Sequence, residues 1–145
     1  MTGFDPAISL PAALALRVGI VAATLLLWRQ RRVARHVAFL GSAAASLVTG
    51  LLAADVLLAG VPLDGAGFVH EASGFRLAYA VDGLSAWFLL VLSLLAVPIA
   101  FFSIGYVGYP HFQRRAVFLG VAFNLLLGAV ELVFAAADAI TFLCA

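Results

Sequence analysis

The sequence predicts an all-α membrane protein with four transmembrane helices, the start of a fifth, and a small external β-hairpin between the second and third helices. Three observations lead to this fold class. The chain is 66% hydrophobic and 10% charged, whereas soluble domains carry about 25% charged residues. Four apolar runs are close to the roughly 20 residues that a bilayer span needs. Arginine is concentrated in the short connections between the runs, which is typical of cytoplasmic loops.

The apolar runs define a single membrane domain, 1–145. They cover about residues 8–28, 37–58, 84–107 and 116–136. The last residues, "ADAITFLCA", turn at Asp138 and begin a fifth apolar helix at about residue 139. The remaining residues to the end of the sequence rise only about 10 Å against a hydrocarbon core of roughly 30 Å. We therefore expect the chain to be the N-terminal part of a longer subunit, truncated in its fifth span.

The polar connections set the expected topology. The first, "RQRRVARH", contains Arg29, Arg31, Arg32 and Arg35. We interpret it as a cytoplasmic loop and expect no nucleic-acid partner, because arginine-rich loops between spans mark the cytoplasmic side. The connection "GYPHFQRR" carries Arg114 and Arg115 and falls on the same side. Counting spans from these loops places the N-terminus and residues 60–82 outside.

The external connection predicts the β-hairpin. In "FRLAYAVD", over residues 75–82, larger apolar residues alternate with small or charged ones, a period of two that is typical of a strand. The preceding "EASG" can turn the chain back on "GFVH". Asp82 then stands at the N-cap of the third helix, where a carboxylate accepts a hydrogen bond from a backbone N–H. We assign Asp82 a structural role.

Three ionisable residues lie inside the expected spans: Arg17, Asp55 and Glu131. Insertion scales assign roughly 2.5–3.5 kcal/mol to a charge near the centre of a span, so such residues face the protein interior and pair. The side chain of Arg17 can extend toward the outer side, which brings all three head groups to similar depth. We predict a buried charge pair of Arg17 with Glu131 or with Asp55.

One face of the fourth span is small and polar. Its members, Gly120, Asn124, Gly128, Glu131 and Asp138, follow helical spacings of four, four, three and seven. Glu131, Asn124 and Asp138 are our candidates for a proton or ion relay; the alternative for Glu131 is a structural ion pair that fixes helix packing. We expect no cofactor and no metal site, because the chain has one cysteine and its three histidines fall in polar connections. We expect no catalytic residue, because the sequence shows no Walker loop, no Rossmann fingerprint and no nucleophile elbow.

From Arg76 onward the sequence resembles the antiporter-like membrane subunits of respiratory complex I, of multi-subunit Na⁺/H⁺ antiporters, and of formate hydrogenlyase and hydrogenase-4 complexes. The resemblance rests on "VDGLS" (81–85), on Tyr106 followed by "FQRR", on "FNL" (123–125) and on "AD" (137–138). Of these, "VDGLS" is the most specific. The sequence departs from the family pattern at Arg17 and at Glu131, where the family commonly has an apolar residue.

This resemblance implies a proton- or ion-translocating, non-catalytic membrane subunit of an NADH-quinone oxidoreductase or hydrogenase-4-like respiratory complex. It implies a multi-pass location in the bacterial inner membrane, with the lipid bilayer and other membrane subunits as partners. In that family the main relay glutamate and lysine lie beyond the position of Ala145, so the 145-residue chain alone is expected to conduct no protons. A self-contained four-helix small transporter that uses Glu131, or a membrane assembly protein, stays open as the alternative.

Overall fold

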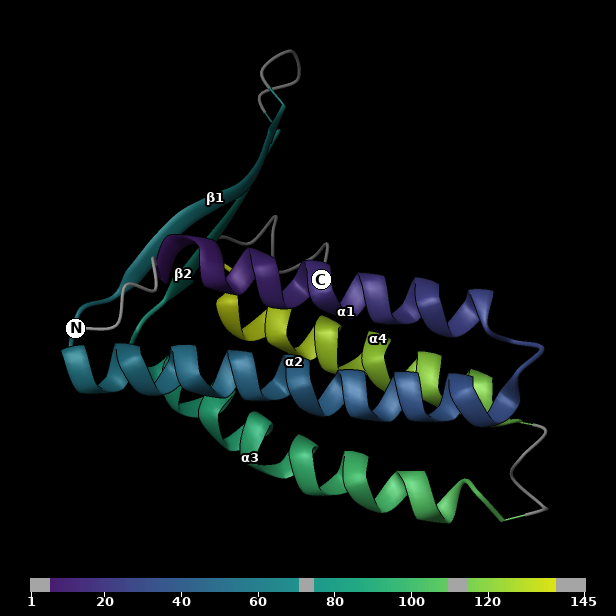
Figure 1. The fold of residues 1–145 in the computed structure, drawn as a ribbon. Coiled ribbons are helices and arrows are strands. Elements are labelled where there is room, and N and C mark those ends of the chain that lie inside the picture. The colour runs from purple at the N-terminus through teal and green to yellow at the C-terminus, as the bar shows by residue number, and fades with distance from the viewer. Residues whose placement is uncertain (1–5, 71–74, 110–114, 138–145) are drawn as a thin grey trace.

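The computed structural model describes residues 6–70, 75–109 and 115–137 (Figure 1). Its elements are α1 (Pro6–Leu26), α2 (Arg31–Ala59), β1 (Leu63–His70), β2 (Phe75–Val81), α3 (Gly83–Tyr106) and α4 (Ala116–Ala135). By length and composition α2, α3 and α4 are each able to cross a membrane, which fits a membrane protein. The apolar stretch of α1 is shorter, Pro11–Leu26. The predicted turn "EASG", Asp138 and the fifth span from 139 lie outside the described residues.

Helix α2 begins earlier than the sequence predicts. The expected second span starts near residue 37, but α2 starts at Arg31, so most of the arginine-rich connection is helical. Only residues 27–30 link α1 to α2, and the backbone N–H of Ala34 already donates to the carbonyl of Gln30 at 2.9 Å. Arginine is a good helix former, and its charged head can remain in water while the backbone continues the helix.

Glycine residues let α2 approach each of its three helical neighbours closely. A Cβ added to Gly41 would lie 2.8 Å from a side-chain carbon of Ile20 on α1, and one added to Gly50 would lie 3.0 Å from Cβ of Ser93 on α3. On α4, a Cβ at Gly120 would lie 2.5 Å from Cβ of Ala38. Small residues at helix contacts are the usual packing device where lipid supplies no hydrophobic drive.

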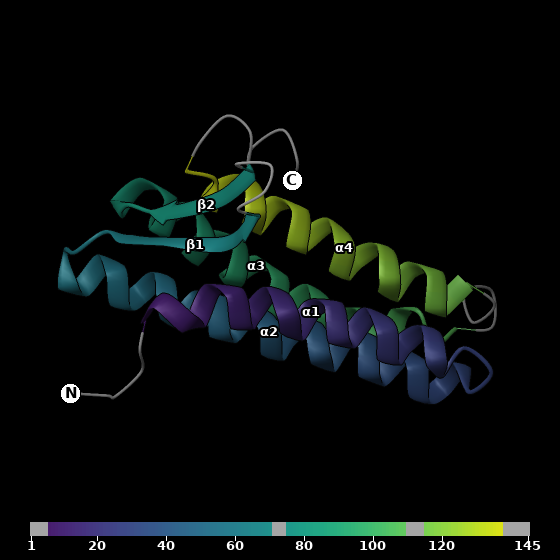
Figure 2. The same ribbon diagram turned by 90° about the horizontal axis from the view of Figure 1, so that it is seen from above.

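The two strands form an antiparallel sheet, with Leu63 paired to Val81 at one end and His70 paired to Phe75 at the other. The register shifts between Ala66 and Phe68, which marks a bulge. The sheet lies at the end of the bundle opposite the α1–α2 connection, with β1 beside α1 and β2 beside α4 (Figure 2). A single β-bridge also joins Tyr79 to Ala136, just after α4.

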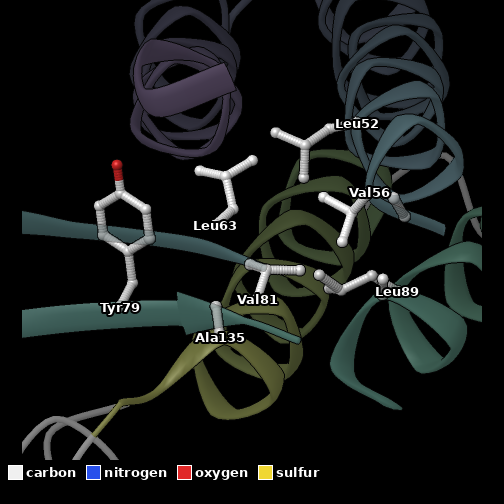
Figure 3. Packing of buried hydrophobic residues seen from close by; sticks show 9 residues of the cluster. Leu52, Val56, Leu63, Tyr79, Val81, Leu89 and Ala135 are labelled. Atoms are coloured by element: carbon white, nitrogen blue, oxygen red, sulfur yellow. The ribbon is translucent and has the colours of Figure 1, made fainter. Parts of the chain in front are cut away.

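The base of the sheet packs against the helices through an apolar cluster (Figure 3). Its buried members are Leu52, Ala53, Val56, Leu63, Tyr79, Val81, Ala86, Leu89 and Ala135. They come from α2, α3, α4 and both strands, so the cluster unites segments that are far apart in the sequence. Leu89 and Val81 are fully buried in it. The base of the sheet is therefore part of the core.

The start of α3 has the predicted cap. The Oδ1 atom of Asp82 accepts a hydrogen bond from the backbone N–H of Ser85 at 2.7 Å, and this bond is the main reason that the pKa of Asp82 lies below its usual value. At the other end of the connection, α2 stops at Gly60, which adopts the left-handed conformation with φ of 65°. Glycine adopts that conformation without strain.

Candidate functional site

The two buried charged residues in the described part of the chain form an ion pair between α1 and α4. The guanidinium of Arg17 donates from Nε to Oε2 of Glu131 at 2.6 Å and from Nη2 to Oε1 at 2.6 Å. Both side chains are almost completely buried, with 3% of Arg17 and 1% of Glu131 exposed. This two-point geometry is the strongest that a guanidinium and a carboxylate can form, and it fixes the orientation of both groups.

Helix α2 completes the site with two serines. The Oγ atom of Ser46 accepts a hydrogen bond from Nη2 of Arg17 at 2.9 Å, and that of Ser42 accepts one from Nη1 at 3.4 Å. Gly128 packs against the arginine, and a Cβ there would lie 3.5 Å from Cδ of Arg17, an ordinary van der Waals distance. One guanidinium thus joins α1, α2 and α4 and uses most of its five donors.

The ion pair lies deep in the bundle. Ser46 comes fifteen residues after Arg31, the first residue of α2, which places it roughly 22 Å along that helix. On α4, Glu131 comes only four residues before Ala135, the last residue of that helix, which is roughly 6 Å from its end. The pair therefore lies inside the bundle, toward the end where α4 finishes. Removing one partner of a buried pair costs about 3–5 kcal/mol, because the other charge is left unpaired.

Asn124 lies two turns of α4 from Glu131 and is also fully buried. Its Nδ2 donates to the carbonyl of Ala38 at 3.0 Å and to that of Gly120 at 2.9 Å. Its Oδ1 is buried and has no hydrogen-bond partner in the part of the chain that the structure describes. Arg17 and Asn124 both line a groove of about 360 Å³ between α1 and α4. A donor, such as water or a further side chain, would satisfy the free acceptor.

The other predicted site residues lie elsewhere. Asp55 is exposed on α2 and makes no ion pair among the described residues, so the structure pairs Arg17 with Glu131 instead. Asp55 lies one turn from the end of α2, where a carboxylate can stay solvated. Asp82 caps α3, and Asp138 lies outside the described residues. Within the described ranges, no three histidine, cysteine or acidic side chains gather as a metal site.

Ser42 and Ser46 are the site residues that sequence reasoning missed. Their four-residue spacing with Gly50 and Ala54 indicates a stripe of small residues for helix packing, and that interpretation omits their hydroxyl groups. The signal that could have identified them is the same spacing, because it places both hydroxyls on the face that meets Arg17.

We also compared the chain with protein families and with curated proteins. No protein-family model matches the chain, and no curated protein matches it significantly. The assignment of function therefore depends on the site and on the sequence resemblance.

Proposed function

We propose that this chain is part of a proton- or ion-translocating, antiporter-like membrane subunit of an NADH-quinone oxidoreductase or hydrogenase-4-like respiratory complex. The proposal includes four membrane crossings, the N-terminus and the sheet on the outer side of a bacterial inner membrane, and other membrane subunits as partners. The observation that carries it is the Arg17–Glu131 pair inside the bundle. Ionisable residues deep in a membrane are expensive and mark ion pathways in most cases.

In this proposal Glu131 is a relay group for protons, and its pairing with the charge of Arg17 controls when it is free to act. Both carboxylate oxygens of Glu131 accept hydrogen bonds from Arg17, so a path that uses this carboxylate requires the guanidinium to move away. The α1–α4 groove, which Arg17 lines, leaves space for that movement. Asn124 lines the same groove, and its buried Oδ1, which has no partner among the described residues, is the acceptor we assign to a water on the path.

The test uses membrane vesicles from cells that carry a tagged copy of the chain as their only copy. NADH oxidation and hydrogen- or formate-driven electron transfer are measured together with proton uptake, and the tagged chain is then purified with its partners. We expect Glu131→Gln to lower the number of protons moved per electron, while Asp55→Asn, which removes an exposed carboxylate, leaves it unchanged. Purification without any redox subunit, or an unchanged ratio in Glu131→Gln, would contradict the proposal.

A self-contained small transporter is the second candidate, because the ion pair is complete within this one chain. Reconstitution of the 145-residue chain alone in liposomes with an internal pH dye separates the two. The subunit proposal expects no proton uptake above empty liposomes when a potential is imposed. Uptake that Glu131→Gln abolishes and Asp55→Asn preserves would instead establish the transporter.

A further inference from the structure

The end of the bundle where α1 passes into α2, at the right of Figure 1, has a strongly one-sided charge. The described residues 27–36, 106–109 and 115–116 lie there. They contain five of the eight arginines and none of the seven acidic residues. The dipoles of the four helices do not change this balance, because two N-termini and two C-termini lie at this end and their partial charges of about half a unit cancel. The arginines therefore set the sign of the local field.

Arg35 differs from the other arginines of this end because it is held between helices. It lies one turn before Phe39, whose ring packs against Phe123 of α4 at 5.8 Å between centroids. Its guanidinium lies against Gly108, just after α3, since a Cβ there would be 2.5 Å from Nη1. Arg29, Arg31 and Arg32 are instead exposed. Arg35 thus lies on α2 against the end of α3, one turn from the point where Phe39 of α2 packs against α4.

Among the described residues, one buried hydrogen-bond donor at this junction lacks an acceptor. The Nε atom of Arg35 is buried and has no partner among the described residues. The first residues of α2 and α4 follow Gln30 and Arg115, and neither of these side chains caps its helix. A buried donor without an acceptor is costly, so such groups mark places where a ligand or water binds.

Two aromatic side chains locate this end at the height of lipid headgroups. Trp28 and Tyr109 are 63% and 65% exposed there, and exposed tryptophan and tyrosine at the ends of apolar helices are typical of the membrane–water interface. The ligand that reaches these donors in a membrane is therefore a headgroup. Arginine binds phosphate oxygens with two parallel hydrogen bonds, and basic pockets between transmembrane helices bind anionic headgroups.

We propose that the junction of α2, α3 and α4 binds the phosphate of one anionic phospholipid headgroup, with the half-buried Arg35 as the main ligand and the exposed arginines as a supporting field. The site is independent of the Arg17–Glu131 pair, which lies far along α2 from it. It requires only that the chain resides in a bilayer. It would hold a lipid against the ends of three helices and so fix their relative position.

The test uses the full chain in uncharged detergent with dansyl-labelled phosphatidylglycerol as the probe. The chain has two tryptophans at opposite ends of the bundle, Trp28 and Trp87. Energy transfer to the dansyl group is measured in Trp87→Phe, which reports from the basic end, and in Trp28→Phe, which reports from the sheet end. We expect saturable transfer from Trp28 that unlabelled phosphatidylglycerol displaces and phosphatidylcholine does not, and weaker transfer from Trp87.

Variants matched in charge then distinguish binding at a specific site from general electrostatic attraction of lipid to the arginines. Removing one exposed arginine, in Arg29→Gln, should weaken binding by about fivefold or less. Arg35→Gln should weaken it by more than about tenfold. Arg35→Lys keeps the charge and should still weaken binding, because lysine lacks the planar donor pair, whereas Arg29→Lys should not. Circular dichroism of each variant establishes that its helices are intact, and Arg35→Lys provides the comparison if Arg35→Gln unfolds.

Several outcomes would overturn the proposal. Equal losses in Arg29→Gln and Arg35→Gln would mean that only the general positive charge attracts lipid. Equal displacement by phosphatidylcholine would mean that the headgroup charge is irrelevant. Displacement by millimolar inorganic phosphate as effective as that by phosphatidylglycerol would assign the site to a free anion instead of a lipid.

Discussion

The centre of the bundle and its sheet-bearing end hold the same elements together by opposite chemistry. At the centre, one guanidinium joins α1, α2 and α4 through a carboxylate and two hydroxyls. At the sheet-bearing end, aliphatic side chains from α2, α3, α4 and both strands form an apolar cluster. The stability of the apolar cluster depends on how completely its side chains fill the available volume. The stability of the polar centre depends on each hydrogen-bond donor facing an acceptor. The two regions should therefore respond differently to the same kind of substitution.

The largest effect is expected at the polar centre. Arg17→Leu leaves the buried Glu131 carboxylate without its partner and should lower the free energy of unfolding by about 3–5 kcal/mol. Combining it with Glu131→Leu should restore most of that loss, because a buried ion pair can be replaced by apolar groups at little net cost. Unfolding in mixed detergent micelles measures all three proteins. A double variant no more stable than Arg17→Leu alone would rule out the pairing as the cause.

The apolar cluster should tolerate a change of shape but not a loss of volume. Leu89→Ala should cost about 2–5 kcal/mol through the cavity it leaves, whereas Leu89→Met, which nearly conserves volume, should cost less than about 1.5 kcal/mol. The same unfolding assay applies. The matched experiment at the centre is Glu131→Gln, which also conserves shape. If it lowers the free energy of unfolding as little as Leu89→Met does, the two regions do not differ in the way described.

A smaller effect is expected where α2 and α4 approach most closely. Gly120→Ala places a Cβ 2.5 Å from that of Ala38, so the helices must separate, at an overpacking cost of about 1–3 kcal/mol. The separation should also stretch the hydrogen bond from Asn124 Nδ2 to the carbonyl of Ala38. Gly19→Ala is the control, because a Cβ at Gly19 meets no atom within 4 Å. Equal stability of the two variants would contradict the close packing.

The smallest effect concerns the cap of α3. Since the pKa of Asp82 is lowered in the folded protein by the N–H of Ser85, its contribution to stability is complete above the unfolded pKa of about 3.9. It is lost as the pH falls through the lower folded value. Asp82→Asn keeps a capping oxygen that does not titrate. The stability difference between the two proteins should therefore change between pH 6 and pH 3, and a constant difference would argue against the charged cap.

The apolar composition and the helical runs were predictable from the sequence, and so were the strand alternation at 75–82 and the capping role of Asp82. These features are local: each depends on the residues of one segment and on the solvent that surrounds it. Boundaries were less predictable. The sequence pattern ends the arginine-rich connection near residue 37, but α2 starts at Arg31, because hydropathy marks where apolar residues begin and arginine continues a helix equally well.

The sequence alone thus determined the helical class, the three charges within apolar runs and the polar face of α4. Only the tertiary structure decided that Glu131, and not Asp55, is the partner of Arg17, and that Ser42 and Ser46 complete the site. The reason is physical. Each of these contacts joins residues on different helices, so it depends on how α1, α2 and α4 rotate and approach, and the lack of a side chain at Gly120 permits the close approach of α4 to α2.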